Sequence, residues 1–128
     1  MPAEDEVRAA VAALVAAFGE GRLDDYFDAF APDCTFLFHT TPEVLPSVQA
    51  YRDLWARWVA DDGFTVLSCS TSGTDIRVFD DVAVVTHDVA TRVRIAGEER
   101  DLRERETIVL RRVDGRWLGV HEHLSPAS

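Results

Sequence analysis

The sequence is poor in several residue types that mark particular classes of protein. It has no lysine, so its 13 basic residues are all arginine, and with 23 acidic residues they give a formal net charge of −10. An acidic chain lacks the basic footprint that phosphate binding needs, which argues against a nucleic-acid partner. The longest apolar run, Ala9–Phe18, is far shorter than the roughly 20 residues that cross a bilayer, so we expect no membrane partner.

Cysteine is also scarce, and the sequence lacks the common catalytic motifs. Cys34 and Cys69 have no metal or redox spacing, so a small core role in a reducing cytoplasm is expected rather than a disulfide scaffold. No glycine-rich phosphate loop, G-x-S-x-G elbow or H-E-x-x-H motif is present. A chain of 128 residues is long enough for one core, and we expect a single domain over residues 1–128.

The hydrophobic pattern predicts helices first and strands afterwards. Apolar residues recur at helical spacing from Val7 to Phe18, and shorter helical patterns follow over residues 23–30 and from Pro46 to Asp62. A strand, Cys34–His39, and a loop, Thr40–Leu45, lie between them, and the loop is the candidate lid. From Phe64 the period changes to two and predicts strands near 64–77, 81–95, 99–112 and 116–125, joined by tight turns. This order predicts an α+β fold with a mainly antiparallel, curved sheet.

Three acidic residues fall among apolar ones on the predicted inner face of the sheet. Three-residue loops at Ala96-Gly97-Glu98 and Val113-Asp114-Gly115 would align Asp88, Glu106 and Glu122 across neighbouring strands. Side chains that face each other in this way have Cβ atoms about 5 Å apart, so like charges would repel. Such a row would hold a proton, pair with an arginine, meet a cationic or hydroxylated ligand, or open into water, and in the first case at least one pKa would rise. The alternative is a register off by one residue, or strand ends that splay into solvent.

Large aromatic residues make up much of the apolar face of the third predicted helix. Tyr51, Trp55 and Trp58 lie at helical spacing and either fill the core or line a pocket, because large rings serve both purposes. His39 ends the first strand beside the candidate lid and is a candidate pocket base.

The predicted outer face of the sheet carries His121 and His123 together with several apolar residues. Metal binding there is disfavoured, because His87 would lie two strands away and Arg105 would add a cation. Apolar residues on this face would otherwise be exposed, so we expect a second subunit to cover them in a homodimer. They are Val85, Val89, Val109 and Trp117.

The C-terminal hairpin resembles a known family. It carries Glu106-Thr107, then Asp114-Gly115-Arg116-Trp117, then Val120-His121-Glu122-His123-Leu124-Ser125. With the order of elements, this pattern resembles the SnoaL-like group of the nuclear transport factor 2-like superfamily, including the association domain of calmodulin-dependent kinase. The resemblance implies a cone-shaped fold of three N-terminal helices packed on the sheet, a pocket between helices and sheet, and dimers through the outer sheet face.

The departures from the family pattern shape the functional prediction. The positions that hold the ketosteroid isomerase catalytic groups align with Leu14, Phe38 and Ile108, so that mechanism is not present as such. The positions that hold pocket arginines in the kinase association domain align with Asp88, Ile108 and Leu124, which implies an acidic pocket.

We therefore predict binding of a small hydrophobic molecule and, if the protein is an enzyme, cofactor-free isomerisation, cyclisation or dehydration of a polyketide- or steroid-like substrate. Asp88, Glu106 or Glu122 would move the proton and His39 would assist. The predicted substrate-binding residues are Tyr51, Trp55, Trp58, Phe38, Ile108, Val120 and Leu124. The alternative is a non-catalytic binding or assembly module, in which the rings pack solidly and an arginine neutralises the acids. Arg52, Arg57 and Arg92 are the candidates for that role.

Overall fold

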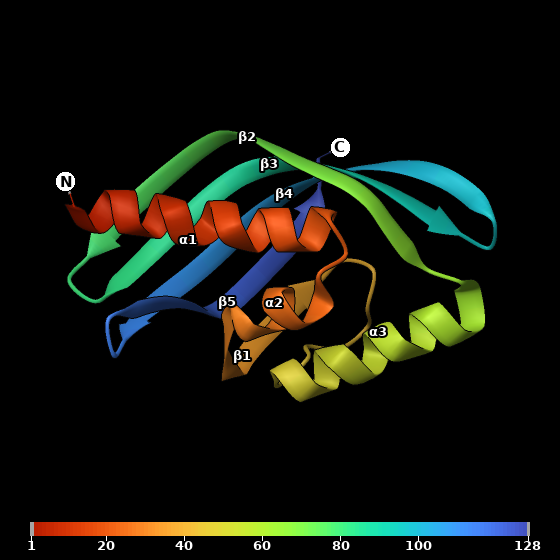
Figure 1. Cartoon of the computed structure of the whole chain (residues 1–128), viewed down its shortest axis with the longest axis horizontal. Coiled ribbons are helices and arrows are strands. Elements are labelled where there is room, and N and C mark those ends of the chain that lie inside the picture. Colours follow the sequence, from red (N-terminus) through yellow and green to blue (C-terminus); the bar gives the residue numbers. More distant parts are fainter. Residues whose placement is uncertain (1, 128) are drawn as a thin grey trace.

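Three helices and one short strand precede a long four-stranded meander within residues 2–127, the part that the computed structural model describes (Figure 1). The elements are α1 (Pro2–Gly19), α2 (Leu23–Asp28), β1 (Phe30–Phe38), α3 (Val48–Asp62), β2 (Thr65–Phe79), β3 (Val82–Ile95), β4 (Glu98–Val113) and β5 (Arg116–Pro126). The sheet has the order β1-β5-β4-β3-β2, and only the β1–β5 pair is parallel. The predicted α+β class and mainly antiparallel sheet are confirmed.

Helix α1 packs its apolar stripe on the concave face of the sheet (Figure 1). The buried side chains of its inner face recur at three and four residues, as predicted. The helix ends at Gly19, where an added Cβ would lie 3.1 Å from the backbone nitrogen of Cys69. Glycine at this position therefore lets the end of α1 approach β2 closely.

Strand β1 begins earlier than the sequence predicted. The expected second helix included Phe30, but α2 ends at Asp28 and Phe30–Asp33 belong to β1. Pro32 is tolerated there because β1 is an edge strand of the sheet. Phe30 pairs with Gly119 of β5, and its ring occupies the space that a Cβ at Gly119 would need, only 2.5 Å away.

Helix α3 begins and ends with recognisable caps. Ser47 caps its start by accepting a hydrogen bond from the Ala50 amide at 3.1 Å, and Gly63 ends it in the left-handed conformation at φ 61°. Pro46, predicted in the first turn of the helix, lies just before the cap. Leu45 makes two backbone hydrogen bonds with Phe36 of β1, so the end of the candidate lid loop is fixed to the sheet.

Two of the predicted turns are one residue too long. Ala96-Gly97 and Asp114-Gly115 are two-residue turns with positive φ at both positions, 52° and 81° in the first and 50° and 79° in the second. This geometry matches the right-handed twist of a hairpin, and Asp-Gly is a strong signal for it. The predicted three-residue loops are therefore wrong, while the short turn at Asp80-Asp81 is confirmed.

The shorter turn after β3 moves its register by one residue. Val85 pairs with Ile108 and His87 with Glu106, so these residues face inward. Asp88, predicted on the inner face, instead pairs with Arg105, is exposed, and lies 3.8 Å from the Arg105 guanidinium. The predicted row of three acids is wrong at Asp88, and His87 occupies the inward position beside Glu106.

A β-bulge in β5 explains the second error in register. Leu110 pairs with Gly119 but Val109 pairs with His121, which leaves Val120 as an extra residue. Trp117 and Gly119 therefore face inward before the bulge, and Glu122 and Leu124 face inward after it. The prediction had placed Leu118 and Val120 inward from a single uninterrupted alternation.

The corrected register changes the outer face of the sheet. Val85, Val89 and Trp117, predicted there, are buried on the inner side, and only Val109 of the four lies outside. His121 does lie on the outer face, where its Nδ1 is 2.7 Å from the Thr35 hydroxyl. The homodimer through this face stays a prediction, without those three residues in its interface.

Candidate functional site

A cavity of about 240 Å³ lies between α3 and the inner face of β3 and β4. We call it the aromatic cavity, because six rings from α1, β1, α3 and the start of β2 line it: Phe18, Phe38, Tyr51, Trp55, Trp58 and Phe64. Five predicted substrate-binding residues line it, namely Phe38, Tyr51, Trp55, Trp58 and Leu124. Ile108 is fully buried in the core instead, and neither Ile108 nor Val120 lines this cavity.

The rings of α3 pack against one another and against β1, where the centroids of Tyr51 and Phe36 are 4.6 Å apart, and they leave space above β3 and β4. Trp55 meets Phe18 and Phe64 edge to face, with ring centroids 5.9 and 5.1 Å apart. Trp58 continues this wall, with its centroid 5.3 Å from that of Phe64, and it is half-buried. The alternative prediction of solidly packed aromatics is therefore not what the structure shows at this end of α3.

A smaller space of about 40 Å³ adjoins the aromatic cavity at its deep end. We call it the acid cavity, because Glu104, Glu106 and Glu122 line it. The two cavities share five lining residues, which makes them neighbouring parts of one site: Phe18, Tyr51, Thr91, Glu104 and Leu124.

A buried hydrogen-bonded chain joins two of the acids to a histidine. His87 Nε2 lies 2.6 Å from Glu106 Oε1, and both residues are buried. Glu106 also hydrogen-bonds to Glu122, which comes from the neighbouring strand β5. The predicted register placed Glu106 directly opposite Glu122, but Glu106 pairs with Leu124 and Glu122 pairs with Ile108, so the two acids are diagonal neighbours. The part of His87 was not predicted, because the predicted register turned it outward.

The two carboxyl groups differ in the direction of their pKa shifts. Burial raises the pKa of Glu122 well above its usual value, and the negative charge of Glu106 raises it further. Burial alone would raise the pKa of Glu106 too, but the hydrogen bonds from Glu122 and His87 lower it below its usual value. The two shifts have opposite directions, so Glu122 is the member of the pair that more readily keeps a proton and Glu106 the one that more readily carries the negative charge.

Two buried polar atoms in this chain have no hydrogen-bond partner within residues 2–127. They are Nδ1 of His87 and Oε1 of Glu122. On His87, Nε2 is the ring nitrogen that contacts Glu106, and Nδ1 is the one without a partner. The Glu122 oxygen is an unused acceptor in a residue that lines the acid cavity.

Glu104 is the site residue that sequence reasoning missed. It lines both cavities, and its Oε2 lies 2.7 Å from Nε2 of His39, the predicted pocket base. The Glu104 side chain is 13 % exposed, against 32 % for that of His39. Glu104 continues the alternation of Glu106 and Ile108 along β4, and that pattern could have identified it.

Two tyrosines complete the deep end of the site. The hydroxyl groups of Tyr26 and Tyr51 lie 3.0 Å apart, and both side chains are buried. Burial raises the pKa of each phenol well above its usual value, and the nearby Glu122 adds to the shift. Burial also raises the pKa of the Cys69 thiol, to about 11, so all three groups stay protonated near neutrality.

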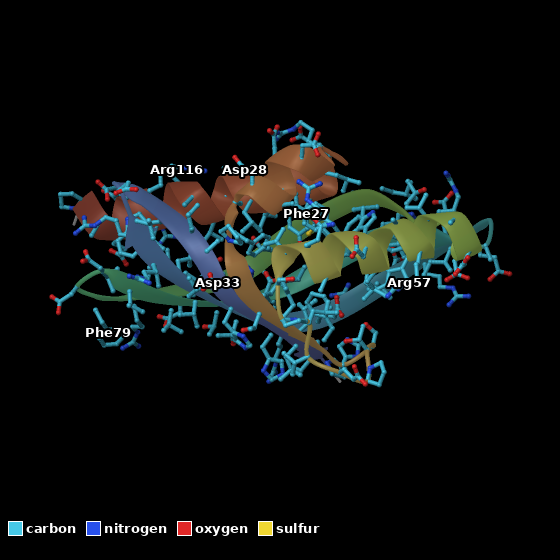
Figure 2. The ribbon with its side chains drawn as sticks, turned by 90° about the horizontal axis from the view of Figure 1, so that it is seen from below. Phe27, Asp28, Asp33, Arg57, Phe79 and Arg116 are labelled. Atoms are coloured by element: carbon cyan, nitrogen blue, oxygen red, sulfur yellow. The ribbon has the colours of Figure 1, made fainter. Side chains whose placement is uncertain are left out.

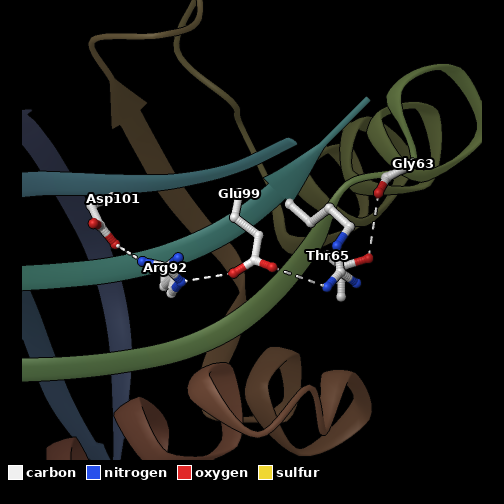
Figure 3. Close-up of polar contacts among 6 residues, drawn as sticks. Gly63, Thr65, Arg92, Glu99 and Asp101 are labelled. Atoms are coloured by element: carbon white, nitrogen blue, oxygen red, sulfur yellow. Dashed lines mark hydrogen bonds and ion pairs between the residues drawn. The ribbon is translucent and has the colours of Figure 1, made fainter. Parts of the chain in front are cut away.

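The arginines expected to neutralise the buried acids are engaged elsewhere or lie at the surface. Arg52 pairs with Asp24 and stacks on Phe27, and Arg57 is exposed on α3 (Figure 2). Arg92 pairs with Glu99 and Asp101 near the β3–β4 turn (Figure 3). The acids of the cavity therefore meet histidines rather than arginines.

Residues 2–127 contain neither a clustered metal site nor a helix that could span a membrane. No group of three or more His, Cys, Asp or Glu side chains there is arranged to hold a metal ion. No helix in this part of the chain is both long and apolar enough to cross a membrane.

The sequence and structure were compared with known proteins. The profile of the SnoaL-like domain matches residues 7–128, and no curated protein matches the chain. A protein from Xanthomonas campestris, provisionally named a calcium/calmodulin-dependent protein kinase II association domain, is 24% identical with a TM-score of 0.77. The match covers 94% of this chain and 85% of that one.

Two further solved structures carry enzyme-related names. A ketosteroid isomerase-like protein from Erwinia carotovora atroseptica is 16% identical with a TM-score of 0.80, and 98% of this chain and 96% of that one are covered. A protein from Novosphingobium aromaticivorans, provisionally named a scytalone dehydratase, is 17% identical with a TM-score of 0.79, over 97% and 83% of the two chains. At these identities the likeness shows the fold alone.

Proposed function

From the SnoaL-like domain family, to which the chain belongs, and its nuclear transport factor 2-like fold, we propose that the protein binds a small apolar molecule. We propose further that it catalyses cofactor-free proton transfer on that molecule. The observation that carries the proposal is the direct adjacency of the aromatic cavity to the acid cavity. An apolar pocket with a few convergent polar groups and shifted pKa values is the usual form of a small-molecule site.

The size of the site favours a compact substrate. The cavity of about 240 Å³ is smaller than the roughly 300 to 1,000 Å³ of typical pockets for drug-sized ligands. A one- or two-ring, polyketide-like compound suits this space better than a four-ring steroid. The rings of Trp55 and Trp58 would hold the apolar body of such a compound by contact with its faces.

Glu104 is the proposed general base. It is the carboxylate that lines both cavities, and the hydrogen bond with His39 holds its side chain in place. It would remove a proton from a carbon beside the substrate carbonyl, and the electron pair of that C–H bond would move to give an enolate. Return of the proton to a different carbon gives an isomer, whereas transfer to a departing hydroxyl group gives a dehydrated product and water.

Glu122 and Tyr51 are the proposed donors to the enolate oxygen. Burial and the negative charge of Glu106 raise the pKa of Glu122, and burial raises the pKa of the Tyr51 phenol, so both groups favour their protonated forms. Donors placed in a buried site stabilise developing negative charge more strongly than the same groups in water. Glu106, bonded to His87, would favour the protonated form of Glu122 through its negative charge, while Asp88 on the outer face has no part in this scheme.

The reaction classes are also suggested by relatives, though only by analogy of fold. Two proteins with similar structures are named ketosteroid isomerase-like and, provisionally, scytalone dehydratase. Isomerisation and dehydration both begin with the removal of a proton next to a carbonyl group, which is the step assigned to Glu104. The alternative function, binding without turnover, uses the same aromatic cavity and none of the acids.

The test is exchange of the carbon-bound protons of small ring ketones in D₂O, followed by NMR. We expect the protein to accelerate exchange on at least one member of a panel such as 1-indanone, 2-tetralone and cyclohexanone. Glu104→Gln should slow the protein-dependent exchange by about 10² to 10⁴-fold, the usual contribution of a general base. Glu99→Gln is the matched control, because Glu99 is a carboxylate of the same strand that is bound to Arg92 outside the cavity.

Two outcomes would contradict this scheme. Exchange that is no faster with the folded protein than without it on every ketone would favour binding without turnover. Exchange that is equally fast in Glu104→Gln and in the wild type would remove Glu104 from the mechanism.

A further inference from the structure

The charge around the cavities is uniformly negative, and from it we infer that the natural ligand is an organic cation: a compact apolar body that carries a protonated amine. This inference rests on the proposed binding site and names the class of ligand. It extends the proposal, because an apolar cavity alone would accept neutral compounds equally well.

The first argument is the composition of the lining. Within the part of the chain that the structure describes, no arginine, lysine or histidine lines either cavity. Four carboxyl residues do: Asp62, Glu104, Glu106 and Glu122. An anionic ligand would meet only like charge here, whereas an ammonium group would meet opposite charge on two sides.

The second argument is the unused acceptor on Glu122. This oxygen, Oε1, is buried and has no hydrogen-bond partner within residues 2–127. A buried acceptor without a partner costs free energy that a ligand donor can recover. An ammonium group carries only donors, whereas a ligand carboxylate would bring a like charge and no donor.

The third argument is the arrangement around the aromatic rings. The faces of Trp, Tyr and Phe rings attract cations, and Trp does so most strongly. Trp58 and Asp62 both come from the last turn of α3, the helix end that carries partial negative charge. Ring faces, a carboxylate and a helix C-terminus thus favour the same charge at one side of the cavity.

The nearby arginines do not cancel the negative charge around the cavities. On β3, Arg92 and Arg94 alternate with the cavity residues Thr91 and Val93 and so point to the other side of the strand. Both pair there with Glu99, and Arg92 also pairs with Asp101 (Figure 3). These cations are therefore held by their own carboxylates outside the cavity.

The histidines that face the acids also leave the balance negative. His39 contacts Glu104, and His87 contacts Glu106. Four carboxyl residues therefore line the cavities, against two imidazoles that are not part of the lining.

The experiment compares three probes that share a phenylethyl body or its nearest match: 2-phenylethylamine, 2-phenylethanol and phenylacetate. Binding is followed by isothermal titration calorimetry and by the fluorescence of Trp55 and Trp58, which line the cavity. We expect the amine to bind at least tenfold more tightly than the alcohol, and phenylacetate to bind most weakly. Glu104→Gln should weaken amine binding several-fold and leave alcohol binding unchanged, whereas Glu99→Gln should change neither.

The remaining outcomes overturn the inference in distinguishable ways. Equal affinity for amine and alcohol would show a neutral apolar site and would leave the proposed function standing. A preference for phenylacetate would show that the net charge of the site has been assigned the wrong sign. An amine preference that survives in Glu104→Gln, in Asp62→Asn and in Glu106→Gln alike would place the bound cation outside these cavities, and the ketone-exchange experiment would still judge the proposed function independently.

Discussion

The two ends of the inner sheet face are packed in opposite ways. Under α1, side chains from the helix and the sheet interlock, and Val7, Val85, Ile108 and Leu110 are at most 1% exposed. Under α3, large aromatic rings pack against one another and border a cavity of about 240 Å³ above β3 and β4. One end is therefore a filled core and the other a hollow one, although the same strands β3 and β4 run beneath both.

The difference lies in the kind of residues that each helix contributes. Helix α1 presents valine, leucine and alanine, whose short side chains let the helix approach the sheet closely. Helix α3 presents Tyr51, Trp55 and Trp58, whose large rings pack on one another and on β1 and border the cavity. The filled end contributes the tightly packed core, and the hollow end carries the proposed binding site.

The strongest test of this contrast removes a leucine from each end of β4. Leu110→Ala at the filled end should lower the free energy of unfolding by about 2 to 5 kcal/mol, because a buried void forms. Leu102→Ala at the hollow end should cost less than about 1 kcal/mol, because Leu102 is 36% exposed and already borders a cavity. Urea unfolding of both variants gives the comparison, and equal losses would contradict it.

The pH dependence of the free energy of unfolding tests the buried acids Glu106 and Glu122, which lie between the two ends. The pKa of Glu122 is raised in the folded protein, so its contribution to stability is present below the usual pKa of Glu and is lost as pH rises through the folded value. The pKa of Glu106 is lowered, so its contribution is present above the usual value and is lost as pH falls through the folded one. Stability should therefore decline as pH rises from about 4.5 toward neutrality.

Glu122→Gln should remove that decline, because glutamine keeps the shape and the donor of the protonated acid without its titration. Urea unfolding at a series of pH values measures the slope for both proteins. A wild-type stability that stays level over this range would show that Glu122 titrates as an ordinary surface acid.

A smaller effect is expected at the tyrosine pair, which separates the core from the acid cavity. Tyr51→Phe should lower the free energy of unfolding by about 1 to 2 kcal/mol, because the buried Tyr26 hydroxyl loses its partner. The double variant Tyr26→Phe with Tyr51→Phe should be no less stable than the single one, since it leaves no hydroxyl unpaired. Thermal unfolding of the three proteins tests this order.

The smallest effect is expected in the ion pairs outside the hollow end. Asp101→Asn removes one partner of Arg92, but Arg92 keeps Glu99 and all three side chains are well exposed to solvent (Figure 3). Surface pairs of this kind contribute little, so the change should stay within about 0.5 kcal/mol and shrink further in salt. A loss as large as that of Leu110→Ala would show that this hairpin is essential to the hollow end.

The sequence was sufficient for the elements and for most of the pocket wall, but not for the register. Helical spacing identified Tyr51, Trp55 and Trp58 together, because a helix repeats whatever its surroundings. The predicted positions of the acids depended on the lengths of the turns between strands. Because the turns were predicted one residue too long, Asp88 was placed on the inner face and His87 on the outer face, the reverse of what the structure shows. A strand has a period of two, so an error of one residue exchanges its faces completely.

The bulge in β5 could not be read from alternation either. Odd-numbered residues, Trp117 and Gly119, face inward before the bulge, and even-numbered residues, Glu122 and Leu124, face inward after it. In the sequence alone, this change cannot be distinguished from an irregular hydrophobic pattern. Only the partner strand, which has no matching extra residue, reveals it. Pairing is a property of two segments far apart in the chain, so one segment alone carries too little information.

The extra residue in β5 also has an evolutionary consequence. Loss of one codon from the middle of a strand normally turns every later side chain to the opposite face of the sheet. Val120 is the exception here, because its removal would leave Gly119 opposite Leu110 and Glu122 opposite Ile108 in an unbroken ladder. Homologous genes are therefore expected to vary in length by one codon at this position, while the acid that follows it keeps its place in the pocket.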